Sequence, residues 1–315
     1  MKTPRSLWRA ALVAALLLLA LLAAWLWTPD LKASDLAQRH LRSPADFVEI
    51  DGVRLHLRDD GPKDAPALLL IHGLGGSLHT WEPWAQALAG PYRVIRLDLP
   101  GSGLSPPDPA GDYTDARSLR LLLALMDRLQ LPRATLVGHS MGGRLAWSFA
   151  AAHPGRVARL VLVAPDGFAS PGFEYDKPAE VPAVLGLMRQ VLPRPLLRMN
   201  LAPAYANEAT LTEPLLDRYF DLIRAPGARE SMLQRMRQTV LTDPLPRLAR
   251  ISAPTLLLWG AQDAMIPPAN AQDYLRALPD SRLVQLDGVG HLPQEEQPQR
   301  GLAALQAFLG PPPSR

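Results

Sequence analysis

The feature that most constrains the fold of this sequence is a regular alternation of short apolar segments with segments of helical periodicity, which begins at Phe47. Residues 47–59 alternate apolar and polar side chains around Asp51-Gly52, a pair that favours a tight hairpin turn. Later apolar segments predict further strands at residues 67–73, 92–98, 134–139, 158–165, 254–260 and 282–288. Helical spacing of apolar residues follows between several of these strands. The alternation predicts an α/β fold with a mostly parallel central sheet flanked by helices.

One long segment interrupts this alternation. Residues 168 to about 246 lack a strand pattern, carry apolar residues at helical spacing, and include seven prolines from Pro171 to Pro214 that keep helices short. The strand before it delivers the segment to the carboxyl edge of the sheet, where ligands bind in open α/β folds. We therefore expect a helical cap insertion over that edge.

The N-terminus has the pattern of a membrane-targeting segment. Lys2, Arg5 and Arg9 precede an unbroken apolar run of 18 residues, 10–27. As a helix this run reaches roughly 27 Å, close to the bilayer core of about 30 Å. Residues 1–27 are therefore expected to be an uncleaved signal anchor that forms a single transmembrane helix. The alternative is a signal peptide that is cleaved to release a secreted protein.

The same segment predicts the location and layout of the rest of the chain. Because the basic residues precede the apolar run, the positive-inside rule places residues 28–315 outside the cytoplasm, in the periplasm if the organism is a bacterium. Residues 28–45 are polar and irregular and are expected to be a tether. Residues 46–310 are expected to form the folded domain that carries the cap.

Charge and cysteine content exclude several classes of function. Lysine and arginine number 33 against 30 acidic residues, and the three N-terminal basic residues account for the difference (33 − 3 = 30). Without a basic patch, no nucleic-acid partner is expected. The chain has no cysteine, which excludes disulfides, thiolate metal sites and a cysteine nucleophile.

A candidate nucleophile lies at a predicted junction between a strand and a helix. Residues 137–143 read VGHSMGG, in which Gly138, Ser140 and Gly142 form the glycine-x-serine-x-glycine pattern of a nucleophile elbow. In such an elbow the serine sits on a sharp turn that only small neighbours permit. Close packing of the helix on the strand would also require glycines, so the pattern alone leaves both interpretations open.

A serine nucleophile needs a base and a carboxylate that orients the base. Of the seven histidines, His291 follows the final predicted strand, where a loop can return over the carboxyl edge; the alternative is a solvated loop histidine. Asp263 follows the strand at 254–260 by three residues and is the expected acid, although it could instead cap a helix. Asp166, just beyond the strand at 158–165, is the rival acid.

With the order Ser140, Asp263, His291, the chain resembles the α/β-hydrolase superfamily, in its serine esterase and lipase-like branch. The resemblance covers about residues 46–310 and rests on GHSMGG together with LLLIHGLGGS (68–77), RLDLPGSGLS (96–105), SAPTLLLWGAQD (252–263) and DGVGHLPQEEQP (287–298). It implies an α/β-hydrolase fold, with an oxyanion hole formed by the backbone amides of Leu74 and Met141.

The resemblance also implies a reaction class. Dehalogenases and epoxide hydrolases of the superfamily carry an aspartate at the elbow, so Ser140 favours acyl transfer to water. We expect a carboxylesterase or lipase that acts without cofactor or metal on small-molecule esters or lipids with apolar acyl chains. Alternatives are a serine-dependent C–C bond hydrolase or lactonase with the same residues, and a ligand receptor on the same scaffold. Apolar cap residues, with flexible Met188 and Met199 among them, are expected to line a tolerant acyl pocket.

Overall fold

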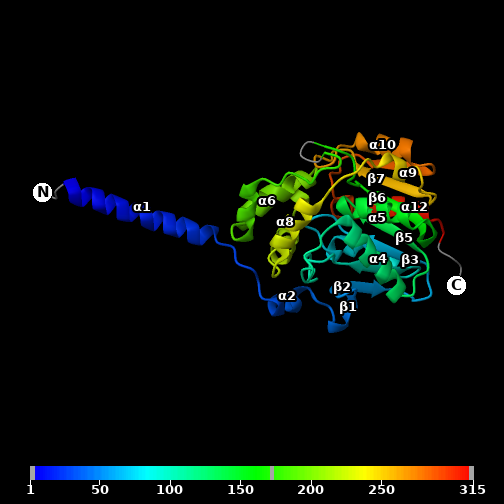
Figure 1. Ribbon diagram of the computed structural model, residues 1–315, viewed down its shortest axis with the longest axis horizontal. Helices are drawn as coiled ribbons and strands as arrows, with labels where there is room; N and C mark the ends of the chain where they lie inside the picture. The colour runs from blue at the N-terminus through cyan, green and yellow to red at the C-terminus, as the bar shows by residue number, and fades with distance from the viewer. Residues whose placement is uncertain (1–3, 171–173, 312–315) are drawn as a thin grey trace.

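The structure, a computed structural model, describes residues 4–170 and 174–311. Its centre is an eight-stranded sheet in the order β1-β2-β4-β3-β5-β6-β7-β8 (Figure 1). The strands are β1 (Phe47–Ile50), β2 (Val53–Asp60), β3 (Ala67–Ile71), β4 (Arg93–Leu97), β5 (Ala134–His139), β6 (Val157–Val163), β7 (Thr255–Gly260) and β8 (Ser281–Leu286). Strands β3 to β8 are parallel to one another, whereas β1 and β2 form an antiparallel hairpin. The predicted mostly parallel α/β sheet is confirmed.

The turn between β1 and β2 has the conformation that its sequence predicts. Asp51 and Gly52 both have positive φ, 48° and 75°, as a type I′ turn requires. Strand β2 then pairs antiparallel with β4, which attaches the hairpin to the edge of the parallel sheet.

Helices cover both faces of the sheet. On one face, α4 (Asp115–Arg128), α5 (Met141–Ala152) and α10 (Asn270–Ala277) bury their apolar sides in the larger core. On the other face, α3 (Glu82–Leu88) and α12 (Pro298–Leu309) pack through Trp84 and Leu305, which are both fully buried. Two buried faces explain why every residue of β3, β4, β5 and β7 is buried.

The expected cap lies between β6 and β7. Its main elements are η4 (Ala183–Arg189), α6 (Arg194–Leu201), α7 (Glu213–Leu222) and α8 (Ala228–Gln238). Residues 171–173 of the predicted insertion lie outside the described residues. The short α9 (Leu245–Leu248) packs against α5 and so belongs to the sheet domain. The cap has a small core of its own, in which Leu216 is fully buried.

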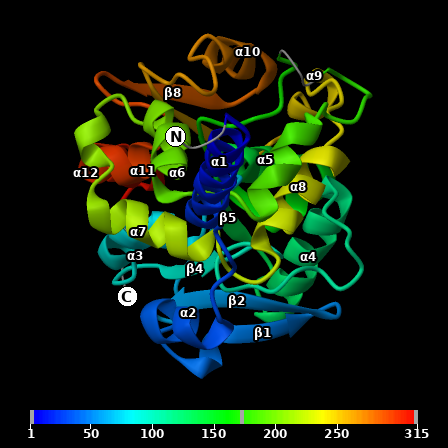
Figure 2. The same ribbon diagram turned by 90° about the vertical axis from the view of Figure 1, so that its left-hand side faces the viewer.

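Helix α1 (Pro4–Leu26) projects from the side of the molecule on which α6 and α7 lie (Figures 1 and 2). Within residues 4–170 and 174–311, no helix is long and apolar enough to span a bilayer. The expected transmembrane segment at residues 10–27 is therefore not supported. Helix α1 contains the charged Arg9 and ends at Leu26, one residue before the end of the predicted run.

Residues 28–45, expected to be an irregular tether, instead form an ordered segment on the cap. They contain α2 (Ala33–His40), whose Leu36 is buried. The amide of Thr28 donates to Gln190 O at 2.7 Å, and buried Arg229 donates to Thr28 O at 2.6 Å. Their pattern looks irregular because several of their partners, such as those of Thr28 and Arg39, belong to the cap rather than to neighbouring residues.

Candidate active site

Ser140 occupies the turn between β5 and α5 in a strained conformation, with φ 52° and ψ −122°. The flanking glycines are sterically necessary. A Cβ on Gly138 would lie 2.2 Å from Gly142 O, and one on Gly142 would lie 2.3 Å from Ile71 O. The glycines therefore serve both close packing and the exposure of the serine.

His291 and Asp263 are brought together from the ends of neighbouring strands. His291 Nδ1 lies 2.8 Å from Asp263 Oδ2, and both side chains are buried. The other carboxylate oxygen, Oδ1, accepts from the amides of Met265 and Ile266 at 2.8 and 2.9 Å. Asp263 therefore holds the turn after β7 and also orients His291. It does not cap a helix, because the next helix, α10, begins only at Asn270 and has Ala269 at its N-cap.

Asp166, the rival acid, has a different partner. Its Oδ2 accepts from Arg144 Nε at 3.1 Å, and Arg144 also pairs with Asp115 on α4. The structure pairs His291 with Asp263 and Asp166 with Arg144, which favours Asp263 as the acid.

His139 is a site residue that the sequence did not reveal. Its ring lies 4.6 Å from that of His291, centroid to centroid, and its Nε2 donates to His291 O at 2.9 Å. Burial, and then the neighbouring His291, hold the pKa of His139 well below its usual value. A neutral His139 thus supports the backbone of the His291 loop.

The proposed oxyanion loop runs beside Ser140. A Cβ on Gly73 would lie 3.1 Å from Ser140 Cβ, so the next residue, Leu74, begins next to the serine. His72 holds this loop, since its Nδ1 donates to Gly73 O at 2.7 Å while its Nε2 accepts from the Leu99 amide at 3.1 Å. Met141 is the first residue of α5, where the helix leaves the amide without an intrahelical acceptor.

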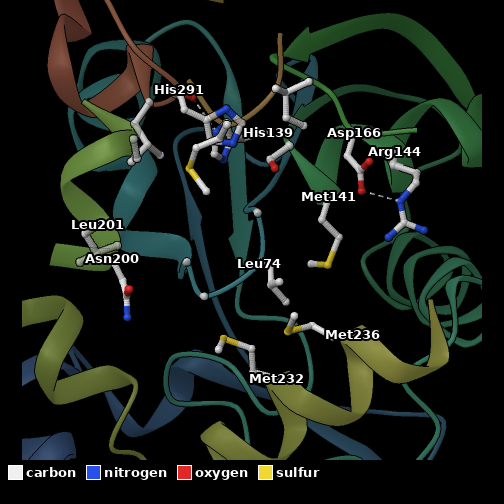
Figure 3. A pocket seen from close by; sticks show the side chains of 18 of the residues that line it. Leu74, His139, Met141, Arg144, Asp166, Asn200, Leu201, Met232, Met236 and His291 are labelled. Atoms are coloured by element: carbon white, nitrogen blue, oxygen red, sulfur yellow. Dashed lines mark hydrogen bonds and ion pairs between the residues drawn. The ribbon is translucent and has the colours of Figure 1, made fainter. Parts of the chain in front are cut away.

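A cavity of about 400 Å³ lies between the sheet edge and the cap (Figure 3). Ser140, His291, Leu74 and Met141 all line it. Most of the remaining lining is apolar, and it includes the methionines Met188, Met232, Met236 and Met265. Met188 lines the cavity as predicted. The prediction for Met199 is wrong, because this residue does not line the cavity and is 63% exposed.

Comparison with known proteins shows the family. Residues 66–298 match the family model described as alpha/beta hydrolase fold. The chain belongs to the α/β-hydrolase family. A curated relative of this α/β-hydrolase, the 2-hydroxy-6-oxononadienedioate/2-hydroxy-6-oxononatrienedioate hydrolase of Paraburkholderia phymatum, is 32% identical over 82% of this chain and 91% of the relative.

Two solved structures resemble this hydrolase at similar levels. The enol-lactonase from Burkholderia xenovorans is 28% identical, with a TM-score of 0.73, over 84% of this chain and 99% of its own. A membrane phospholipase A described as a bacterial virulence factor is also 28% identical, with a TM-score of 0.73, over 96% of this chain and 98% of its own.

The cap of this hydrolase is tied directly to the His291 loop. His291 N donates to Ala204 O at 2.7 Å. Glu295, in the short helix α11 (Pro293–Glu296), accepts from the hydroxyls of Tyr205 and Tyr219 at 2.7 and 3.0 Å and pairs with Arg218. Burial first, and then nearby negative charge, raise the pKa of both tyrosines, so their hydroxyls stay protonated and donate. One network of hydrogen bonds and an ion pair therefore connects the loop of His291 to the cap.

The part of the chain that the structure describes contains no group of three or more histidine, cysteine or acidic side chains placed to hold a metal ion.

Proposed function

We propose that this hydrolase cleaves carboxylic esters with apolar acyl chains through an acyl-enzyme. Ser140 Oγ attacks the ester carbonyl while His291 takes its proton, and Asp263 stabilises the imidazolium. The amides of Leu74 and Met141 stabilise the oxyanion. His291 then protonates the departing alcohol, and a water activated by the same histidine releases the acid.

The observation that carries the proposal is the charge of the cavity wall. Arg144 is the one lysine or arginine among the described lining residues, and it pairs with Asp115 and Asp166. The described lining of the cavity therefore offers no free cation to bind a substrate carboxylate. The apolar lining suits an uncharged acyl chain.

A second candidate is a serine-dependent C–C bond hydrolase or lactonase. It is supported by two similar proteins, the relative from Paraburkholderia phymatum and the enol-lactonase. Their names indicate hydrolysis of a 2-hydroxy-6-oxo-dioate and of an enol-lactone. The dioate in the first name denotes two carboxylates, and the paired Arg144 is the reason that we place this candidate second.

The test is a series of p-nitrophenyl esters from acetate through butyrate to octanoate, assayed beside an enol-lactone and a 2-hydroxy-6-oxo-dienoate. We expect kcat/KM to rise by up to about 0.8 kcal/mol per methylene, roughly fourfold, until the cavity is full. Ser140→Ala is the control for background hydrolysis. A steady fall from acetate to octanoate contradicts the apolar acyl pocket, and faster turnover of the dienoate or the lactone favours the second candidate.

We further propose that residues 28–315 lie outside the cytoplasm. The support is the placement of Lys2, Arg5 and Arg9 before the apolar run. Protease added to intact cells that lack an outer barrier should digest the domain. N-terminal sequencing of the digested and undigested protein then tells whether residues 1–27 are retained or cleaved, and protection from the protease contradicts the proposal.

A further inference from the structure

The cavity contains an ion pair that the hydrolytic reaction does not use. Arg144 lies one turn along α5 from Ser140, and Asp166 lies three residues beyond β6, so both side chains reach the cavity wall (Figure 3). Arg144 Nε donates to Asp166 Oδ2 at 3.1 Å. A second carboxylate, from Asp115, binds the other side of the guanidinium but does not line the cavity.

The two partners differ in what they present to a ligand. The Arg144 side chain is 4% exposed, whereas that of Asp166 is 27% exposed. Of the charged groups in this cluster, only Asp166 presents its charge to the cavity, since Asp115 does not line it. Burial lowers the pKa of Arg144, but the charges of Asp115 and Asp166 outweigh burial and raise it, so the cation persists. A ligand in the cavity therefore contacts the carboxylate of Asp166, whereas the guanidinium of Arg144 is covered.

We propose that Asp166 is a specificity-determining residue, which masks Arg144 and excludes acyl chains that carry a negative charge. Neutralising Asp166 should remove its repulsion of a substrate carboxylate and leave the charge of Arg144 to attract it. This inference rests on the proposed ester hydrolysis.

The Asp166 side chain can be altered without removing what holds its backbone. The amide of Asp166 donates to Ser140 O at 3.1 Å. Its carbonyl accepts from Trp147 Nε1 at 3.2 Å and from the Tyr274 hydroxyl at 2.8 Å. These bonds do not involve the carboxylate, so Asp166→Asn should keep both the fold and the elbow.

The experiment compares two esters that differ in charge and by one methyl group: p-nitrophenyl hydrogen adipate, with a free carboxylate, and its methyl-capped form. Wild type should prefer the capped ester. Asp166→Asn should shift the ratio of the two kcat/KM values by about tenfold or more toward the acid, because the repulsion by Asp166 is removed while the attraction by Arg144 remains. Asp115→Asn is the matched control and should leave the ratio unchanged, since Asp166 still covers Arg144.

Further measurements separate the possible failures. In Asp166→Asn combined with Arg144→Met, the gain toward the acid should disappear. Calorimetric titration of adipate, which needs no turnover, should detect binding to Asp166→Asn and none to wild type. If neither ester is hydrolysed by wild type, the proposed function fails while the titration still tests the masking. An unchanged ester ratio together with no adipate binding by folded Asp166→Asn overturns the inference.

Discussion

His291 Nδ1 and Asp263 Oδ2, 28 residues apart in the chain, lie 2.8 Å from each other at the carboxyl edge of the sheet. With Nδ1–H donating to the carboxylate, Nε2 is the nitrogen left to face the cavity. Asp263 is itself held by two backbone amides, which restrain its carboxylate within the turn. The relationship fixes the orientation of the base before substrate arrives.

Asp263→Asn should lower kcat on the order of 10³-fold to 10⁴-fold, because an amide favours the wrong tautomer of His291. Asp166→Asn should have only a small effect on neutral esters, since Asp166 pairs with Arg144. Steady-state kinetics on p-nitrophenyl butyrate measures both, with Asp273→Asn on α10 as a control. If Asp166→Asn is the more severe variant, the assignment of the acid is wrong.

Ser140→Ala and His291→Ala should each lower kcat by at least about 10⁴-fold, and the double variant should be little worse than either. The reason is that the hydroxyl and the imidazole act in one proton transfer, so removing the second group removes nothing more. Circular dichroism should show the fold intact in all three. If Ser140→Ala retained a tenth of the activity, the assignment of Ser140 as the nucleophile would be wrong.

Stability should fall in mild acid because of buried neutral His79. Burial lowers the pKa of His79 from 6.5 to about 4. Below pH 6.5 the histidine of the unfolded chain binds a proton that buried His79 in the folded chain does not. The contribution of His79 to the free energy of unfolding is therefore complete above pH 6.5 and is lost as the pH falls toward 4. The loss at pH 4 is about 3 kcal/mol from this residue.

Urea unfolding at several pH values measures this dependence. His79→Gln should make the stability profile flatter between pH 6.5 and 4, whatever its effect at neutral pH. The control is His153→Gln, at the partly exposed end of α5. Equal slopes for wild type and His79→Gln contradict the prediction.

The segment before α2 should stabilise the cap. A chain that begins at Thr28 keeps the bonds of Thr28 and Asp30 to Arg229, whereas one that begins at Lys32 loses both. Because Arg229 is 3% exposed, leaving it unpaired should cost about 1–3 kcal/mol. The shorter chain should melt lower by about 2–4 °C per kcal/mol. Thermal melts of the two chains compare them directly, and identical melting temperatures would show that these bonds do not stabilise the cap.

The sequence predicted the sheet and the candidate site because both follow from local patterns. Parallel strands bring their carboxyl ends to one edge, so Ser140, Asp263 and His291 could be placed together from their distances to strand ends. Sequence spacing does not show which aspartate faces His291, and this left Asp166 open. The role of His139 could not be predicted from the sequence, because its partner is a backbone carbonyl 152 residues away.

The N-terminal region was the least predictable part for a related reason. Hydropathy describes a segment in isolation, whereas residues 28–40 take their structure from contacts with the cap. Arg39 and His40 both bind Asp221, 182 and 181 residues further along. Such pairs leave no periodic signal in the sequence.

The glycines of the elbow determine where this enzyme can be engineered. No side chain fits at Gly138 or Gly142, because each Cβ would collide with backbone that cannot move independently. Mutant libraries that vary these positions would consist mostly of unfolded chains. Ser140 can be exchanged on an unchanged scaffold, and diversity is better placed at Met188, Met232 and Met236, whose flexible side chains come from two cap elements, η4 and α8. Directed evolution of this protein should therefore alter its substrate range far more readily than the backbone conformation that holds Ser140.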